Sequence, residues 1–310
     1  MSAKEENLRR AFVFGNAAVD EVFQVRDLPV AGESVLGTTA SMGLGGKGAN
    51  QAIALARTGM PTTLLSAVGS DWYGREITKA LSCEPLETEL FERKDIPSDR
   101  SIVFAQEHGD NVIVTTNACA RSISANECMS LLEHCRAGDA VLLQGNLRTD
   151  VTATVCQEAR RRDAFLVLNP SPFDTAFHDL LNLTDALFVN ESEAFSLTGL
   201  SRQEALAALL RAGPRQIVLT LGSEGSLLAC KSEVIHVPAI KAEIVDVTGA
   251  GDCFEGVAVG SSLRRGNRID EAAIIHATKA AGQTIGALGA SQAFPNKKVI
   301  ESLVQNSDAV

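Results

Sequence analysis

Short apolar runs alternate with helical patterns through the middle of this 310-residue chain. The apolar runs lie at residues 140–143, 165–168, 186–189 and 216–221, and the helical patterns lie between them at 150–162 and 191–197. Such alternation is typical of a mostly parallel β-sheet covered by helices. The sequence therefore predicts an α/β fold, in which ligands bind at the carboxyl ends of the strands.

Two β-rich segments, at about residues 20–42 and 100–116, do not follow this alternation. The second contains a hairpin signal at His108-Gly109-Asp110. We expect these segments, with bounds of about 18–42 and 99–118, to pair into a small sheet that forms a lid on a single α/β domain spanning residues 1–310. The remaining predicted elements are a strand at 11–15 and helices at 47–58, 252–265 and 270–285.

The composition excludes several classes of partner and location. A net charge of −10 opposes binding to nucleic acid or to an anionic membrane. The charged first ten residues do not resemble a signal peptide, and no apolar stretch approaches the length of a membrane span. The seven cysteines include no Cys-x-x-Cys pair, and the five histidines lack metal-ligand spacing. We therefore expect a cytoplasmic protein that binds neither nucleic acid nor membrane.

Residues 244–256 have the features of an anion site. An apolar segment leads into Gly249, Ala250, Gly251 and Asp252, and residues suited to a helix follow. The first N–H groups of such a helix are unpaired, and the helix dipole also favours an anion there. A carboxylate at Asp252 would repel a phosphate. Its presence is explained if it takes the proton from a hydroxyl that then attacks the phosphorus. The motif alone leaves two interpretations equally open: a phosphoryl-transfer site, or a glycine turn with an aspartate at a helix start.

A second glycine cluster lies at residues 43–51 (GLGGKGANQ). It satisfies the G-x-G-x-x-G spacing, but a strand and a β-rich segment precede it, so it matches a dinucleotide-binding fold poorly. It also lacks the Gly-Lys-Ser/Thr of a Walker loop. The glycines would instead let the backbone approach a small polar ligand, while Lys47 and Asn50 supply the hydrogen bonds that a polyol needs.

Two further polar motifs follow predicted strands. Asn190 and Glu193 would share the first turn of a helix and are able to hold Mg²⁺ through its waters. For this motif alone, however, a helix cap with acidic residues near the dipole is the favoured interpretation. Residues 220–225 (TLGSEG) either contact a nucleotide or turn the chain.

Five segments, taken in order, resemble the landmarks of the ribokinase family of sugar kinases, also called the phosphofructokinase B family, and most closely its ribokinase branch. They are residues 45–51 (GGKGANQ), 169–172 (NPSP), 190–193 (NESE), 220–225 (TLGSEG) and 246–252 (DVTGAGD). The resemblance covers nearly the whole chain. It implies a three-layer fold with helices on both faces of the sheet, a β-sheet lid that serves as a homodimer interface, and an ATP-dependent carbohydrate kinase that uses Mg²⁺ and, in the ribokinase branch, a monovalent cation such as K⁺.

The resemblance also assigns roles to single residues. Asp252 would be the base, and the amides of Gly249, Ala250, Gly251 and Asp252 would form the anion hole. The residues facing the sugar would be Asp20, Gly46, Lys47, Asn50, Asn146 and Asp252. The nucleotide site would be lined by Asn190, Thr220, Gly222, Gly225 and Gly251, with Asn190 and Glu193 serving Mg²⁺ and phosphate. The monovalent cation would be held by Asp246, Thr248 and the loop that ends at Gly289.

Two positions depart from the ribokinases in ways that bear on the substrate. Ala18 stands where ribokinases carry an asparagine, and Asn146 stands where they carry a glutamate; both family residues bind sugar hydroxyls. Because a buried unmatched polar group costs about 1–3 kcal/mol, the changes predict an enzyme that is not selective for ribose. A third departure, residues 291–293 (SQA), lies where ribokinases place a late serine near the cation.

Two alternatives remain open. A nucleoside kinase of the same fold would use the same Asp252 beside a more aromatic acceptor pocket, and the single Trp and single Tyr of this chain weigh against it. A non-catalytic sugar-binding regulatory protein would keep the pocket around Lys47 and Asn50 and lose the base or the anion hole. Both of these features are intact in this sequence.

Overall fold

The computed structural model describes residues 8–106, 111–266 and 268–305, and its largest element is a nine-stranded sheet of order β13-β12-β11-β10-β9-β8-β1-β4-β5. The strands are β1 (Ala11–Phe14), β4 (Thr62–Gly69), β5 (Glu87–Arg93), β8 (Ala140–Gln144), β9 (Phe165–Asn169), β10 (Ala186–Asn190), β11 (Gln216–Thr220), β12 (Ser226–Cys230) and β13 (Val234–Val237). From β11 to β5 all neighbours pair in parallel, whereas β12 and β13 extend the sheet antiparallel. The predicted mostly parallel sheet is confirmed.

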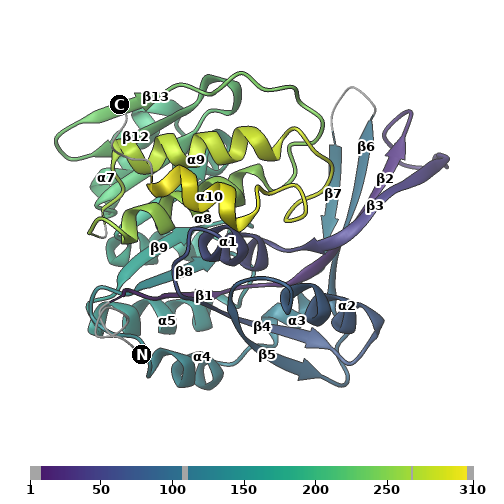
Figure 1. Cartoon of the computed structure of the whole chain (residues 1–310), viewed down its shortest axis with the longest axis horizontal. Helices are drawn as coiled ribbons and strands as arrows, with labels where there is room; N and C mark the ends of the chain where they lie inside the picture. The colour runs from purple at the N-terminus through teal and green to yellow at the C-terminus, as the bar shows by residue number, and fades with distance from the viewer. Residues whose placement is uncertain (1–7, 107–110, 267, 306–310) are drawn as a thin grey trace.

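Helices cover both faces of this sheet (Figure 1). On β1, Ala11 and Val13 belong to one hydrophobic core, while Phe12 and Phe14 belong to the other, because successive side chains of a strand point to opposite faces. The first core includes α1 (Lys47–Ala56), α2 (Trp72–Leu81), α8 (Ala250–Leu263), α9 (Glu271–Thr284) and α10 (Lys297–Gln305). The second includes α3 (Ala118–Arg121), α4 (Ala125–Leu132), α5 (Thr149–Arg161), the 3₁₀ helix η1 (Thr175–Leu183), α6 (Glu191–Thr198) and α7 (Arg202–Ala212). The three-layer arrangement is thus confirmed.

A separate four-stranded sheet stands beside the main body on the right of Figure 1. Its order is β3 (Gly37–Gly45), β2 (Ala18–Val25), β6 (Asp99–Gln106) and β7 (Asn111–Thr115). The β2–β3 and β6–β7 pairs are antiparallel, and β2 pairs with β6 in parallel. The two β-rich segments therefore do pair, as the sequence indicates. β3 runs to Gly45, past the expected end near residue 42, so this sheet leads directly into the glycine cluster.

Other boundaries and elements differ from the sequence-based prediction. α8 begins at Ala250, two residues before the expected start, and Gly249 is its N-cap. The patterns of β4, α2 and β5 gave no prediction, although β4 is buried along its whole length. The predicted hairpin turn at His108-Gly109-Asp110 lies outside the described residues. No helix in the described ranges is long and apolar enough to cross a bilayer.

Candidate active site

The glycine turn before α8 presents unpaired backbone donors. Gly249 has a φ of +75°, a left-handed conformation that favours glycine, and a Cβ there would lie 3.1 Å from the Cα of Ala290. The N–H of Ala250 donates to the Val247 carbonyl at 3.2 Å, but within the described residues the N–H groups of Gly251 and Asp252 have no hydrogen-bond partner. A Cβ on Gly251 would meet nothing within 4 Å, so the space beside this helix start is open. The turn has the geometry of an anion site.

Asp252 is buried and held by side chains of α1. Its Oδ2 accepts a hydrogen bond from Asn50 Nδ2 at 3.0 Å, and its Oδ1 accepts one from Gln51 Nε2 at 3.2 Å. The residue is 8% exposed, and Lys47 Nζ lies 3.8 Å from Oδ1. Both carboxylate oxygens are therefore fixed next to the open donors of the turn. The glycine cluster and the Gly249–Asp252 turn, which lie some two hundred residues apart in sequence, meet at this carboxylate.

The lid sheet brings a second buried carboxylate, Asp20 on β2, to the same region. A Cβ at Gly45 would lie 1.9 Å from Asp20 Oδ2, so only glycine leaves room for this carboxylate. The pKa of Asp20 is raised to about 6: burial is the largest cause, a hydrogen bond from Ser101 opposes the rise, and the charges of Asp252 and Asp246 add to it. The Oδ1 atom of Asp20 has no hydrogen-bond partner within the described residues. Asp20 is therefore a free acceptor at the base of the lid.

Lys47, the first residue of α1, lies near several carboxylates. Burial lowers the pKa of its ammonium, but the carboxylates of Asp252, Glu193 and Glu255 more than offset this, and the net pKa is raised. Lys47 is thus a fixed positive charge between α8 and the start of α6. Gly46, which precedes it, has a φ of +91°, and a Cβ there would lie 3.0 Å from the Asn16 carbonyl oxygen.

A cavity of about 760 Å³ reaches the glycine turn from the side of β11. It is lined by four of the five residues predicted for the nucleotide: Thr220, Gly222, Gly225 and Gly251. Asn190, the fifth, does not line it. The sequence analysis missed most of the remaining wall, which comes from residues 239–247 and from α9. The only sequence signal for this contact is the glycine at position 282. A Cβ there would lie 2.4 Å from Ile240, so the glycine allows α9 to pack against the 239–247 segment.

Asn190 and Glu193 form the helix cap that was the favoured interpretation of their motif. The Asn190 side chain accepts from the Glu193 N–H at 2.8 Å, and Glu193 Oε2 accepts from the Asn190 N–H at 3.0 Å. Asn169 Nδ2 also donates to Glu193 Oε2, at 3.4 Å. No three acidic, histidine or cysteine residues of the described chain form a cluster that could hold a metal ion. Asn190 and Glu193 therefore fit a Mg²⁺ ion that is held mainly through waters and substrate phosphates, and not one enclosed in a protein cage.

Asp246 joins the other two residues predicted for the monovalent cation. Its Oδ1 accepts from the Thr248 N–H and its Oδ2 from the Gly289 N–H, both at 2.9 Å. The oxygens keep their second lone pairs for a cation, so the arrangement fits the predicted ligand type.

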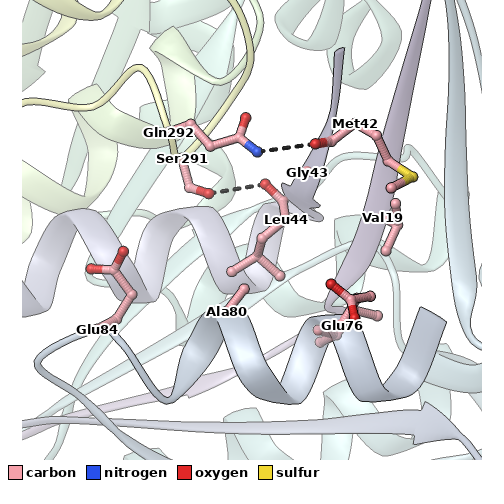
Figure 2. A pocket seen from close by; sticks show the side chains of 10 residues that line it. Val19, Met42, Gly43, Leu44, Glu76, Ala80, Glu84, Ser291 and Gln292 are labelled. Carbon is pink, nitrogen blue, oxygen red and sulfur yellow. Dashed lines mark hydrogen bonds between the residues drawn. The ribbon is translucent and has the colours of Figure 1, made fainter. Parts of the chain in front are cut away.

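The loop after Gly289 also contacts the lid. Figure 2 shows the Ser291 hydroxyl donating to the Leu44 carbonyl, at 2.9 Å, and Gln292 Nε2 donating to the Met42 carbonyl, at 3.4 Å. The two residues, β3 and α2 enclose a cavity of about 260 Å³. The 291–293 segment, where the sequence departs from the ribokinases, therefore ties the proposed cation loop to the lid strand.

Comparison with known proteins identifies the family. A family model described as pfkB family carbohydrate kinase matches residues 9–297. The chain belongs to this family. It is therefore a carbohydrate kinase, a phosphotransferase. The ribokinase of Bacillus subtilis is 32% identical to this kinase over 298 residues, a match that covers 96% of this chain and 100% of that protein. The ribokinase of Mus musculus is 26% identical, with 95% and 94% covered.

Solved structures agree with this assignment. A ribokinase from Giardia lamblia superposes on this chain with a TM-score of 0.85 and 24% identity, and the match covers 96% of this chain and 99% of that one. This likeness supports the assignment of the fold. The ribokinase of Arabidopsis thaliana in complex with ribose and ATP has a TM-score of 0.82 and 26% identity, with 96% and 99% covered.

Asn146, which was predicted to face the sugar, is buried, and its Oδ1 has no partner in the described part of the chain. Three other polar residues near the predicted site were not identified from the sequence. Gln144, two residues earlier, donates to Gln51 Oε1 at 2.6 Å. Ser101 faces Asp20 through strand pairing, a contact with no local sequence signal. The position of Glu255 could have been predicted, because residues three apart on a helix lie on the same face and Glu255 comes three residues after Asp252.

Proposed function

We propose that this kinase transfers the γ-phosphoryl group of ATP to a hydroxyl, a primary one, of a small sugar. The single observation that carries the proposal is the position of Asp252, whose two oxygens are held by Asn50 and Gln51 beside the unpaired N–H groups of the glycine turn. The cavity of about 760 Å³ that ends at Gly251 has room for a nucleotide. The complex of the Arabidopsis ribokinase with ribose and ATP supports both substrate classes.

In the proposed reaction the sugar hydroxyl gives its proton to Asp252 as its oxygen bonds to the γ-phosphorus. The bond from that phosphorus to the bridging oxygen breaks, and ADP leaves with the electron pair. The N–H groups of Gly251 and Asp252 donate to the phosphoryl oxygens, on which negative charge accumulates. Lys47, 3.8 Å from the base, supplies positive charge on the same side. A positioned base commonly contributes about 10²–10⁴-fold to the rate.

Two cations have candidate sites in this proposal. Asn190 and Glu193 would hold Mg²⁺ through its waters, and the ion when bound neutralises phosphate charge. Asp246, Thr248 and the Gly289 loop would hold K⁺ beside the anion hole. The Asp246 hydrogen bonds to Thr248 and Gly289 already set the spacing of this loop.

We propose that the enzyme is not selective for ribose. Ala18 is fully buried and paired with Gly45 in the lid sheet, so it offers no side-chain hydrogen bond to a sugar. Asn146 supplies a neutral amide where ribokinases have an anionic acceptor. The 32% identity with a ribokinase leaves ribose as one sugar to be tested among others.

We also propose a homodimer formed through the lid. Val112, Ile113 and Val114 on β7 are 42%, 50% and 58% exposed, and they lie on the sheet that stands away from the main body in Figure 1. Exposed apolar side chains on such a sheet are typical of an interface. The cytoplasmic location stays part of the proposal.

The test is a screen for ADP release with pentoses, hexoses, their phosphates and nucleosides, with and without K⁺. We expect turnover with a small sugar and a loss of at least about 10²-fold in kcat for Asp252→Asn, with the Kd for ATP nearly unchanged. Turnover of Asp252→Asn within a few-fold of the wild type would refute the role of the base. A preference for nucleosides would favour the nucleoside kinase instead, and sugar binding without ADP release would favour a regulatory protein.

A further inference from the structure

A buried acidic side chain lies next to the proposed base and takes no part in the reaction described above. Glu255 is 3% exposed and stands one turn after Asp252 on α8. Its Oε2 accepts a hydrogen bond from Gln51 Nε2 at 3.2 Å, and within the described residues its Oε1 has no hydrogen-bond partner. A buried carboxyl is costly, so its presence beside the base calls for a function.

The amide of Gln51 connects the two acidic side chains. Its Nε2 has two N–H groups: one donates to Asp252 Oδ1 and the other to Glu255 Oε2, each at 3.2 Å. Its Oε1 accepts from Gln144 Nε2 at 2.6 Å. If the Gln51 amide were flipped, its oxygen would face the two carboxyl oxygens and its nitrogen would face the donor Nε2 of Gln144. Gln144 and Glu255 together therefore fix the orientation in which Gln51 holds Asp252.

We propose that Gln51 and Glu255 are positioning residues for the base: Gln51 fixes Asp252 directly, and Glu255 fixes Gln51. Asn50 holds the other oxygen of Asp252, so the carboxylate cannot rotate while both contacts persist. The inference rests on the proposed function of Asp252 as the base. Because a shift of about 1 Å in a reacting group can cost 10²-fold in rate, holding this carboxylate has a kinetic value.

The charges around Glu255 support an uncharged carboxyl there. It is faced by Asp252 on its own helix, by Lys47 and Gln51 on α1, and by Glu193 on α6. Burial raises its pKa well above the usual value; Asp252 raises it further, Lys47 lowers it and Glu193 raises it. Such a raised pKa favours the uncharged form of the Glu255 carboxyl. An amide at position 255 has the same shape as the protonated acid.

The test compares Glu255→Leu, Glu255→Gln and a control on the same helix, Ser262→Ala, whose hydroxyl bonds to its own helix at the Val259 carbonyl. We expect Glu255→Leu to lower kcat by about 10–100-fold while changing the KM for ATP by less than about 2-fold. Glu255→Gln should restore most of this loss, because it keeps an acceptor for Gln51. Ser262→Ala should keep the wild-type kcat.

The decisive measurement repeats Glu255→Leu in an Asp252→Asn background. A positioning residue acts through Asp252, so the second substitution should then change the residual rate by less than about 2-fold. An equal loss in both backgrounds would show a merely structural role and overturn the inference, as would a wild-type kcat for Glu255→Leu alone. A wild-type protein without sugar-dependent ADP release would overturn the proposed function and the inference together, whereas the two preceding results leave the proposed function standing.

Discussion

Replacing Asp20 with asparagine should stabilise the folded protein at neutral pH. In the folded state, burial raises the pKa of Asp20 from 3.8 to about 6, a hydrogen bond from Ser101 opposes the rise, and Asp252 and Asp246 add to it. The folded pKa thus lies above the unfolded one, and between these values the folded state binds more protons. Stability therefore falls as the pH rises from about 4 to about 6, and the full cost of the ionised carboxylate is present above that range.

The size of the effect follows from the two pKa values. A difference of about 2 units corresponds to about 3 kcal/mol, since each unit is worth about 1.4 kcal/mol. Asparagine carries no charge at any pH and has nearly the same shape, so Asp20→Asn should remove most of this cost. The expected gain is about 2–3 kcal/mol at pH 7.5 and close to zero at pH 4.

The assay is urea unfolding of the wild type and Asp20→Asn at several pH values between about 4 and 7.5, with Asp95→Asn as the control. Asp95 is an exposed aspartate, so its substitution should change the stability little at any pH. A gain for Asp20→Asn that is the same at both ends of the pH range would refute the reasoning, and so would no gain at pH 7.5. The stabilised variant should also bind sugar at least about 10-fold more weakly, because it loses a charged acceptor worth about 1.5–3 kcal/mol.

Two further substitutions test the glycine turn before α8 and the proposed Mg²⁺ site. Gly249→Ala places a Cβ at a φ of +75° and 3.1 Å from Ala290, so it should cost about 1–3 kcal/mol and lower kcat; Gly199→Ala, at a φ of +68° with nothing within 4 Å, should cost only the backbone part and keep kcat. Equal urea midpoints and rates for these two variants would count against the packing argument. Glu193→Ala removes the acid proposed to serve Mg²⁺ and should raise the half-saturating Mg²⁺ concentration about 10-fold in a titration of ADP release. The control Glu191→Ala, which breaks an ion pair with Arg202, should leave this concentration unchanged. An unchanged half-saturating concentration in Glu193→Ala would refute the proposed role.

The sequence predicted the features that depend on local pattern. The strands from β8 to β11 are short apolar runs bounded by turns, and the helices predicted at 150–162 and 191–197 indicated parallel pairing for β8 with β9 and for β10 with β11. The turn at Gly249 was recognisable because only a few residue types suit a helix start with a left-handed residue before it. In the structure Lys47 and Asn50, which the resemblance assigned to the sugar side, lie beside Asp252.

The features that the sequence did not predict depend on distant contacts. Ser101 lies beside Asp20 because β2 and β6 pair in parallel, a register that neither strand indicates alone. The hydrogen bonds of Gln51 join β8, α1 and α8, so no single motif contains them. The wall of the nucleotide cavity formed by residues 239–247 has no regular secondary structure, and its position is set by packing against α9.

Three buried oxygens on the predicted sugar side indicate the chemistry of a ligand that would bind there. Within the described residues, Asp20 Oδ1, Asn50 Oδ1 and Asn146 Oδ1 all lack a hydrogen-bond donor. All three are oxygens, so the predicted sugar side has acceptors to satisfy and needs a ligand that donates. A polyol donates one O–H from each hydroxyl, whereas an apolar ring would leave these atoms unpaired at about 1–3 kcal/mol each. Burial is the main cause of the raised pKa of Asp20, and a further hydroxyl that donates to the ionised carboxylate would favour its charge. Sugar binding should therefore lower the pKa of Asp20, and the affinity for sugar should weaken as the pH falls below about 6.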